Sequence, residues 1–267
     1  MADSERIFVQ AIRRYCARHD IAVDSRAGGW LIAMRRGDKR RFAFGYDIGL
    51  NSAIAHRLAN DKSATAETLT LADVPCIPHH LFLNPKLGVH VAGPGWRETM
   101  LALLAQNPQG VVVKPNEGTS GRSAFKVTTE AELDHAAREV FSMSTGLVIS
   151  PYVAIEEEVR VVLLDDVPLV VYSKQRGSDW RHNLDAGAKP VLLADGEVRA
   201  ACAQLAIDAA NAVGIRFASI DVVRVDGEWR VLEINSGVMM EALAKLHPDL
   251  VQATYDAALD RVFGETR

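Results

Sequence analysis

The segment DVVRVDGEWRVLEINSG, residues 221–237, constrains this chain more than any other part of it. Two apolar runs flank an Asp-Gly pair, which predicts a β-hairpin. Asp221 and Glu233 then lie on adjacent strands, and Asn235 shares the face of Glu233 because side chains alternate along a strand. A Glu inside an apolar strand is costly to bury without a cation partner. Two carboxylates and an amide oxygen suit Mg²⁺, so the hairpin predicts a magnesium site that bridges nucleotide phosphates.

A second segment, VVVKPNEGTSGRS at residues 111–123, places a lysine at the end of a buried strand and a Gly-rich loop after it. Lys114 would direct its ammonium at phosphates, and Gly118 and Gly121 would let backbone N–H groups approach them closely. The order differs from a Walker loop, in which the lysine follows the glycines. A plain strand–turn–strand explains this segment equally well.

A third segment, ISPYVAIEEEVR at residues 149–160, is a strand that leads into an acidic turn. The end of such a strand offers backbone groups to an adenine edge, and a carboxylate just beyond it can accept ribose hydroxyls. For any one of Glu156, Glu157 and Glu158, a solvated acidic turn is the simpler interpretation.

Four cations form the fourth feature: Arg160, Lys174, Arg176 and Arg181. Arg160 and Lys174 each fall within an apolar strand, so an inward-facing side chain there needs an anionic partner. A triphosphate or an acyl phosphate would supply one. The commoner fate of any single cation is a salt bridge at the surface.

The remaining pattern mixes helices with strands and predicts the α+β class. Amphipathic spacing predicts helices at 5–19, 129–143, 195–213 and 248–263, the second of which opens with Thr129 as its cap. Two more are expected within 49–72, the second capped by Asp61. Further strands are expected at 80–83 and in a hairpin around Gly37-Asp38, whereas residues 177–190 read as a polar loop.

Composition excludes several classes of function. The formal net charge of −4 gives no basic surface for nucleic acid, and the basic run at 35–41 reads as a solvated turn. No apolar run approaches the roughly 18 residues that cross a bilayer. The N-terminus lacks the pattern of a signal peptide, and three dispersed cysteines favour reduced thiols. We therefore expect a soluble cytoplasmic protein with no nucleic-acid or membrane partner.

Taken in order, K-P-x-x-G-x-x-G, the acidic hinge, the arginines and lysine, and E-I-N-S resemble the ATP-grasp superfamily over residues 58–260. The likeness is greatest to RimK-type amide ligases and to the ATP-grasp parts of cyanophycin synthetase and bifunctional glutathione synthetases. It implies an ATP-grasp fold, with two α+β subdomains gripping ATP. Residues 58–150 would form the small subdomain with the phosphate flap, and 151–267 the large subdomain with the metal site. Residues 1–57 would be a reduced N-terminal region, a helix plus a β-hairpin.

The resemblance also implies a role for each matching position. The nucleotide-binding set would be the lysines Lys62 and Lys114, the flap residues Gly118, Thr119, Ser120 and Gly121, the adenine hinge Ser150, Pro151, Tyr152 and Val153, and Glu156 or Glu157 at the ribose. The catalytic set would be Arg160, Lys174, Arg176, Arg181 and Asn183. The metal ligands would be Asp221, Glu233 and Asn235.

These roles imply an enzyme that uses ATP and Mg²⁺, with Mn²⁺ as an alternative, to join a small-molecule carboxylate to an amine through an acyl phosphate. Amino acids or short peptides are the expected substrates. A phosphotransferase and a non-catalytic nucleotide-binding module are the alternatives. His182 is either a base for the amine or a surface histidine.

Two features depart from the family pattern. The family's larger α/β substrate domain is replaced here by residues 1–57, so a partner subunit or the second copy in a homodimer is one way to complete the substrate pocket. The segment V-M-M-E also follows E-I-N-S-G where a Pro-Gly turn is expected, and Glu241 has no assigned role.

Overall fold

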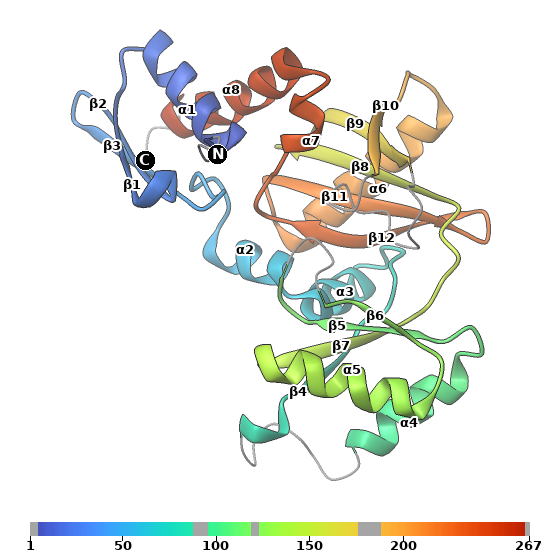
Figure 1. Cartoon of the computed structure of the whole chain (residues 1–267). Coiled ribbons are helices and arrows are strands. Elements are labelled where there is room, and N and C mark those ends of the chain that lie inside the picture. The colour runs from blue at the N-terminus through green and yellow to red at the C-terminus, as the bar shows by residue number, and fades with distance from the viewer. Residues whose placement is uncertain (1–4, 88–95, 119–122, 176–187, 265–267) are drawn as a thin grey trace.

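The computed structural model describes residues 5–87, 96–118, 123–175 and 188–264. Within these residues, three antiparallel sheets carry helices on their faces, as Figure 1 shows. The mixture of helices and antiparallel sheets confirms the α+β class. The structure defines the sheets and their cores but does not test where one proposed subdomain ends and the next begins. The bounds 58–150 and 151–267 therefore stay predictions.

The five-stranded sheet contains the predicted hairpin and has the strand order β10-β9-β8-β11-β12. Its strands are β8 (Glu157–Leu164), β9 (Val167–Gln175), β10 (Lys189–Leu192), β11 (Phe217–Val225) and β12 (Glu228–Asn235). Asp226 and Gly227 join β11 to β12 with positive φ values of 52° and 79°, as a tight hairpin requires. The face with Val161 and Ile220 packs against the alanine-rich helix α6 (Glu197–Val213) in one apolar cluster.

The four-stranded sheet has the order β4-β7-β5-β6 and lies below the five-stranded sheet in Figure 1. Its strands are β4 (His80–Leu83), β5 (Val111–Pro115), β6 (Phe125–Val127) and β7 (Gly146–Pro151). One face packs against α4 (Trp96–Gln106) and α5 (Glu130–Met143), which share a core with Val113 and Ile149. Thr129 and Glu132 form a capping box at the start of α5, which confirms the predicted cap.

Two helices and an extended segment connect the two sheets. The helices are α2 (Ala53–Asn60) and α3 (Lys62–Leu71), and Asp61 caps α3 as predicted. Beyond α3, the chain passes along β12, where Val231 N–H donates to Pro75 O at 2.8 Å and Ile77 N–H donates to Val231 O at 2.9 Å. It then enters β4 and pairs with β7, so residues 75–80 bridge from one sheet to the other.

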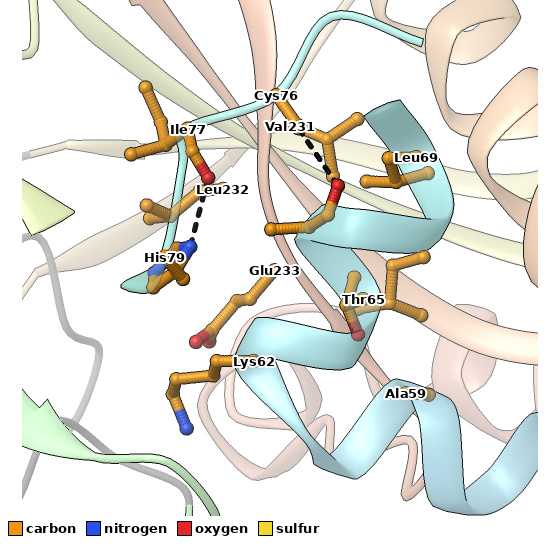
Figure 2. A pocket seen from close by; sticks show the side chains of 12 residues that line it. Ala59, Lys62, Thr65, Leu69, Cys76, Ile77, His79, Val231, Leu232 and Glu233 are labelled. Carbon is orange, nitrogen blue, oxygen red and sulfur yellow. Dashed lines mark hydrogen bonds between the residues drawn. The ribbon is translucent and has the colours of Figure 1, made fainter. Parts of the chain in front are cut away.

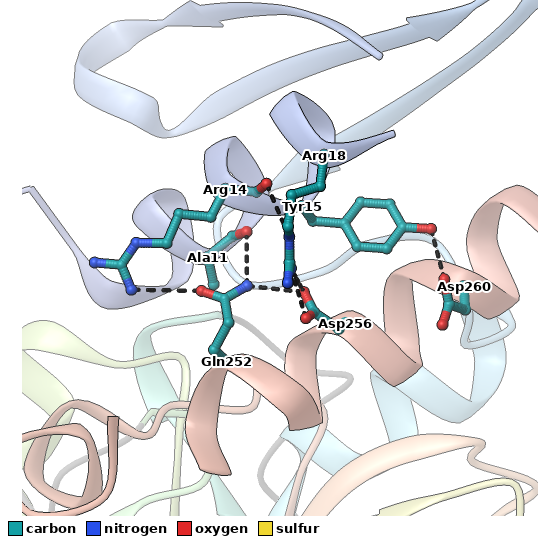
Figure 3. Close-up of polar contacts among 7 residues, drawn as sticks. All are labelled: Ala11, Arg14, Tyr15, Arg18, Gln252, Asp256 and Asp260. Atoms are coloured by element: carbon teal, nitrogen blue, oxygen red, sulfur yellow. Dashed lines mark hydrogen bonds and ion pairs between the residues drawn. The ribbon is translucent and has the colours of Figure 1, made fainter. Parts of the chain in front are cut away.

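The N-terminal elements share one core with the C-terminal helix. They are α1 (Ile7–Arg18), β1 (Ala22–Arg26), the short 3₁₀ turn η1 (Ala27–Gly29), β2 (Leu31–Arg36) and β3 (Lys39–Phe44). Helix α1 packs on α8 (Pro248–Gly264), and Figure 3 shows their polar contacts. Tyr15 donates to Asp260 at 2.8 Å and Arg18 pairs with Asp256 at 2.6 Å. The apolar cluster beneath continues to Val162 and Phe217 in the five-stranded sheet.

Several helices and strands have no clear signal in the sequence and were not predicted. Strand β1 has a polar sequence, and α4 buries only Met100, so neither gives a strong period. Strand β10 carries Pro190 at a sheet edge, where a missing backbone donor is tolerated, and it overlaps the loop expected at 177–190. The short elements η2 (Pro85–Leu87) and α7 (Glu241–Ala244) were also not expected. No helix in the described ranges is long and apolar enough to cross a membrane.

Candidate active site

A row of charged residues crosses one face of the five-stranded sheet. Asp221 on β11 lies opposite Arg160 on β8 and opposite Glu233 on β12, where a β-bulge shifts the register of the hairpin by one residue. Arg160 holds both oxygens of Asp221, with Nε–Oδ1 and Nη2–Oδ2 distances of 2.7 Å. Lys174 on β9 contacts Asp221 Oδ2 at 2.7 Å and also pairs with Glu158. Asp221 and Lys174 are only 1% and 4% exposed, so this is a buried network of two acids and two bases.

Pairing within this network keeps its buried side chains ionised. Burial alone would raise the pKa of Asp221, but the charges of Arg160 and Lys174 outweigh it and hold that pKa well below the ordinary value. Burial raises the pKa of Glu158, and the negative charge of Asp221 adds to that effect. Bidentate pairing with Asp221 keeps the guanidinium of Arg160 charged. Removing one member would leave its partner buried and unpaired.

The structure changes the expectation for three of these residues. The sequence suggested that Arg160 and Lys174 would find their anion in a bound phosphate, whereas Asp221 and Glu158 supply it within the chain. The interpretation of Glu158 as a solvated turn residue is wrong, because Glu158 is buried within β8. The signal that was overlooked is its spacing: Glu158 lies two residues before Arg160 and therefore on the same face.

Glu233 and Asn235 are the acidic and amide groups at the edge of this row, and neither is paired with a cation among the described residues. They lie two residues apart on β12, both half-buried, with Asn235 Nδ2 donating to Glu233 Oε1 at 3.4 Å. No group of three His, Cys, Asp or Glu side chains among the described residues could hold a metal ion by itself. The donor set fits a magnesium ion that takes its remaining ligands from phosphates and water, which is how Mg²⁺ is usually held.

Lys62 approaches from α3, on the other side of this edge. Its Nζ donates to Gly118 O at 2.8 Å and lies 3.4 Å from Asn116 O. Asp61 fixes this helix start, since its two oxygens accept from Ala64 N–H at 2.8 Å and from Asn116 Nδ2 at 2.7 Å. The first turn of α3 is thereby bonded to the segment that follows β5. Nothing in the sequence indicates that Asn116 would make this contact.

Lys114 is half-buried near the end of β5, and no described residue bonds to its ammonium. Burial lowers the pKa of Lys114 to about 8, with Glu233 opposing the shift and Lys62 adding to it. Burial likewise lowers the pKa of Lys62, against the attraction of Glu233. Two lysines with weakened proton affinity beside one carboxylate form a site short of negative charge, which an incoming phosphate would supply.

A pocket lies between α3, residues 76–79 and β12, and Figure 2 shows it from close by. Lys62, Glu233 and His79 border its polar part, while Ile77 and Leu232 border its apolar part. Ile77 belongs to a small apolar cluster, against which Val153 and Leu232 pack. The pocket thus lies between the helix that carries Lys62 and the strand that carries Glu233.

The hinge residues lie where β7 ends. Ser150 is buried, and Tyr152 N–H donates to Gly110 O at 3.0 Å while Lys126 lies 3.5 Å from the centre of the Tyr152 ring. Glu156 accepts from Gly227 N–H at 3.0 Å, and Glu157 pairs with Arg224 in the β8–β11 register. The ribose role of Glu156 or Glu157 therefore stays a prediction, as do the roles of Pro151 and Val153.

Part of the expected site falls outside the described residues. Thr119, Ser120, Gly121, Arg176, Arg181 and Asn183 are in this group, together with His182. Gly118 is described, and its φ of +127° is a backbone conformation that only glycine adopts readily. The predicted phosphate loop therefore begins with a residue whose identity its backbone requires.

The fold and these residues together define an ATP-grasp protein, and comparison with known proteins gives the family. The RimK-like ATP-grasp domain matches residues 97–252. The chain belongs to the RimK-like ATP-grasp family. It is 23% identical over 198 residues to a probable alpha-L-glutamate ligase of Haemophilus ducreyi, and 26% identical over 205 residues to that of Haemophilus influenzae. These matches cover 73% of this chain but only 60% and 61% of the relatives.

Solved structures confirm the ATP-grasp fold. D-alanine–D-alanine ligase from Bacillus anthracis, crystallised with ATP, matches 80% of this chain with a TM-score of 0.62 at 18% identity and is itself covered to 68%. A bifunctional glutathione synthetase from Pasteurella multocida matches 96% of this chain with a TM-score of 0.54 at 14% identity, with 45% of that chain covered.

Proposed function

We propose that this protein is an ATP-dependent carboxylate–amine ligase that forms ADP and works through an acyl phosphate. The observation that carries the proposal is the register that sets Asp221 between Arg160 and Glu233, with Lys62 and Lys114 near the same Glu233. Cations from one sheet and lysines from the other side thus surround a carboxylate and an amide oxygen. That arrangement suits the charge of a triphosphate.

The chemistry needs little from the protein beyond alignment and charge. A substrate carboxylate oxygen bonds to the γ-phosphorus while the bond to the β,γ-bridging oxygen breaks and ADP leaves. The amine then bonds to the acyl carbon, the C–O bond to phosphate breaks, and the amine loses a proton. Lys62 and Lys114 would bind the phosphates, while Arg160 and Lys174, which are already paired with Asp221 and Glu158, would hold the acidic strands of the site in place. Held by Glu233 and Asn235, with Asp221 beside them, Mg²⁺ would neutralise phosphate charge.

Amino acids are the proposed substrates, and glutamate is the first to test because the relatives are named as glutamate ligases. The curated relatives extend well beyond the region that this chain matches, so substrate choice need not be shared. The proposal also includes a homodimer, in which a second copy of the chain contributes residues to the substrate pocket.

The test follows ADP and phosphate release together with product mass. The protein is incubated with ATP, Mg²⁺, glutamate and pools of amino acids and dipeptides. We expect release that depends on both a carboxylate and an amine, and a product lighter than its reactants by one water. Glu233→Ala should abolish it, whereas Glu228→Ala, exposed on the same strand, should not. ADP formation with a phosphorylated product and no free phosphate would instead identify a phosphotransferase.

A further inference from the structure

His79 is a buried histidine with one ring nitrogen unused. The side chain is 4% exposed, and its Nδ1 lies 2.9 Å from Ile77 O. Because a carbonyl only accepts, Nδ1 carries the proton and Nε2 presents a lone pair. Nε2 is buried with no hydrogen-bond partner among the described residues. A buried acceptor left without a donor is costly, so a donor is expected to reach it at some stage of the protein's work.

The sheet register shows which side chain can reach Nε2. His80 pairs with Ile149 on β7, so His79 lies one step further, beside Ser150. On the other side of β7, Lys114 pairs with Val148. Side chains two residues apart on a strand share a face, so His79 and Lys114 emerge on the same face from the strands that flank β7. The buried, short side chains of Val148 and Ser150 lie between them.

The electrostatics of His79 agree with this placement. After burial, the ammonium of Lys114 is the strongest influence that lowers the pKa of His79, ahead of Lys62. The imidazole is therefore neutral, and a neutral acceptor removes no charge from a neighbouring lysine. Lys114 itself has three N–H donors and no bonded partner among the described residues.

We propose that His79 is a positioning residue for Lys114: its Nε2 accepts one N–H of the ammonium and leaves the other two for nucleotide phosphates. A carboxylate in this place would hold the lysine equally well but would cancel its charge. The imidazole directs the ammonium and leaves the full positive charge for the ligand. This inference rests on the proposed function, since it takes Lys114 as a nucleotide-binding residue.

A double-mutant cycle tests the inference through the affinity for a non-hydrolysable ATP analogue, measured by calorimetry with Mg²⁺. His79→Phe keeps an aromatic ring of similar shape without an acceptor, and Lys114→Met keeps the chain without its charge. His79→Phe should weaken binding on the order of tenfold, the effect expected for one hydrogen bond to a charged group. In the Lys114→Met background it should cause no further loss, because the residue acts through the lysine.

Two further variants separate positioning from a structural effect. His79→Gln restores an acceptor and should recover most of the affinity, and His80→Phe, an exposed neighbour, should bind like the wild type. Losses that add in the double variant, or wild-type affinity in His79→Phe, would overturn the inference while leaving the ligase proposal intact. Wild-type protein that binds no ATP analogue would overturn both.

The native protein offers a measurement that does not depend on a foldable variant. The ¹⁵N resonance of His79 Nε2 should shift upfield when the ATP analogue binds, as an acceptor does when it gains a hydrogen bond. The same resonance in Lys114→Met should not respond. An unresponsive Nε2 in the wild type, under conditions where the analogue is bound, would contradict the pairing.

Discussion

At the scale of single residues, the site separates buried charges that hold the sheet together from half-buried charges that remain available to a ligand. Asp221 and Glu233 lie opposite each other on adjacent strands, yet within the described part of the chain Asp221 alone has both oxygens bound by cations. The two acids are thus alike in sequence context and different in their expected response to substitution.

Asp221→Asn should destabilise the protein by about 3–5 kcal/mol, because Arg160 and Lys174 would stay buried with a charge uncompensated. Glu233→Gln should lower the free energy of unfolding by less than about 1 kcal/mol while abolishing ligation, since no cation among the described residues is paired with this half-buried acid. Urea unfolding and ADP release, measured on both variants, check this. Equal losses of stability would show that Glu233 is also a structural residue.

The pKa of Lys114, about 8, predicts how nucleotide affinity depends on pH. Below pH 8 the ammonium is present and binding is at full strength; above pH 8 the free protein loses this proton and must regain it to bind phosphate. Affinity should therefore fall as pH rises through 8, by at most tenfold per pH unit. Calorimetry from pH 6.5 to 9.5 measures the slope.

Lys114→Arg is the matched control for this pH dependence, because a guanidinium stays protonated throughout the range. Its affinity should be lower or higher by a constant factor, with the slope above pH 8 removed. A slope that persists in Lys114→Arg would assign the titration to another group.

At the scale of elements, the polar contacts around Asp61 join the start of α3 to the segment beyond β5. Asp61→Ala removes the helix cap and the bond to Asn116 together. We expect a loss of about 1–2 kcal/mol in unfolding free energy and weaker ATP binding, because Lys62 follows directly on this turn. Thermal unfolding and calorimetry provide the two readings.

Ser52→Ala supplies the comparison, since Ser52 caps the neighbouring helix α2 through Ala55 N–H at 3.2 Å. This variant should lose a similar fraction of stability and keep its ATP affinity. If both variants bind ATP equally, the cap at Asp61 serves only the helix.

At the scale of the whole molecule, the N-terminal elements and α8 bury the far part of the sheet face that carries the charged row. Phe8 and Tyr15 of α1 share one apolar cluster with Phe263 of α8 and with Val162 and Phe217 of the sheet. The N-terminal elements are therefore part of the core that supports the site.

A chain that begins at Ser52 should fail to fold cooperatively, because α8 and the sheet would lose the apolar surface that covers them. The 267-residue chain should melt in a cooperative transition. Circular dichroism on heating, with binding of a hydrophobic dye, distinguishes the two. A cooperative transition at the intact protein's temperature in the shorter chain would show that the N-terminal region folds separately.

The sequence alone determined the local elements with strong periods and the residues that chemistry singles out. The β11–β12 hairpin follows from its apolar runs and its Asp-Gly turn, and the caps at Asp61 and Thr129 follow from their side chains. The opposition of Asp221 and Glu233 does not follow from the turn, because the register that starts at Val225 and Glu228 would place Leu232 opposite Asp221. A β-bulge shifts the pairing by one residue and brings Glu233 there instead. The family could be predicted because its motifs recur in order.

Only the tertiary structure decided which charges meet. Glu158 and Lys174 pair across neighbouring strands, Asn116 reaches Asp61 from 55 residues away, and His79 and Lys114 share one sheet face on either side of β7. Each of these placements depends on strand order and on the burial that surrounds it. Strand order and burial cannot be predicted from the spacing of residues along one segment, because both arise from the packing of segments that are distant in the chain.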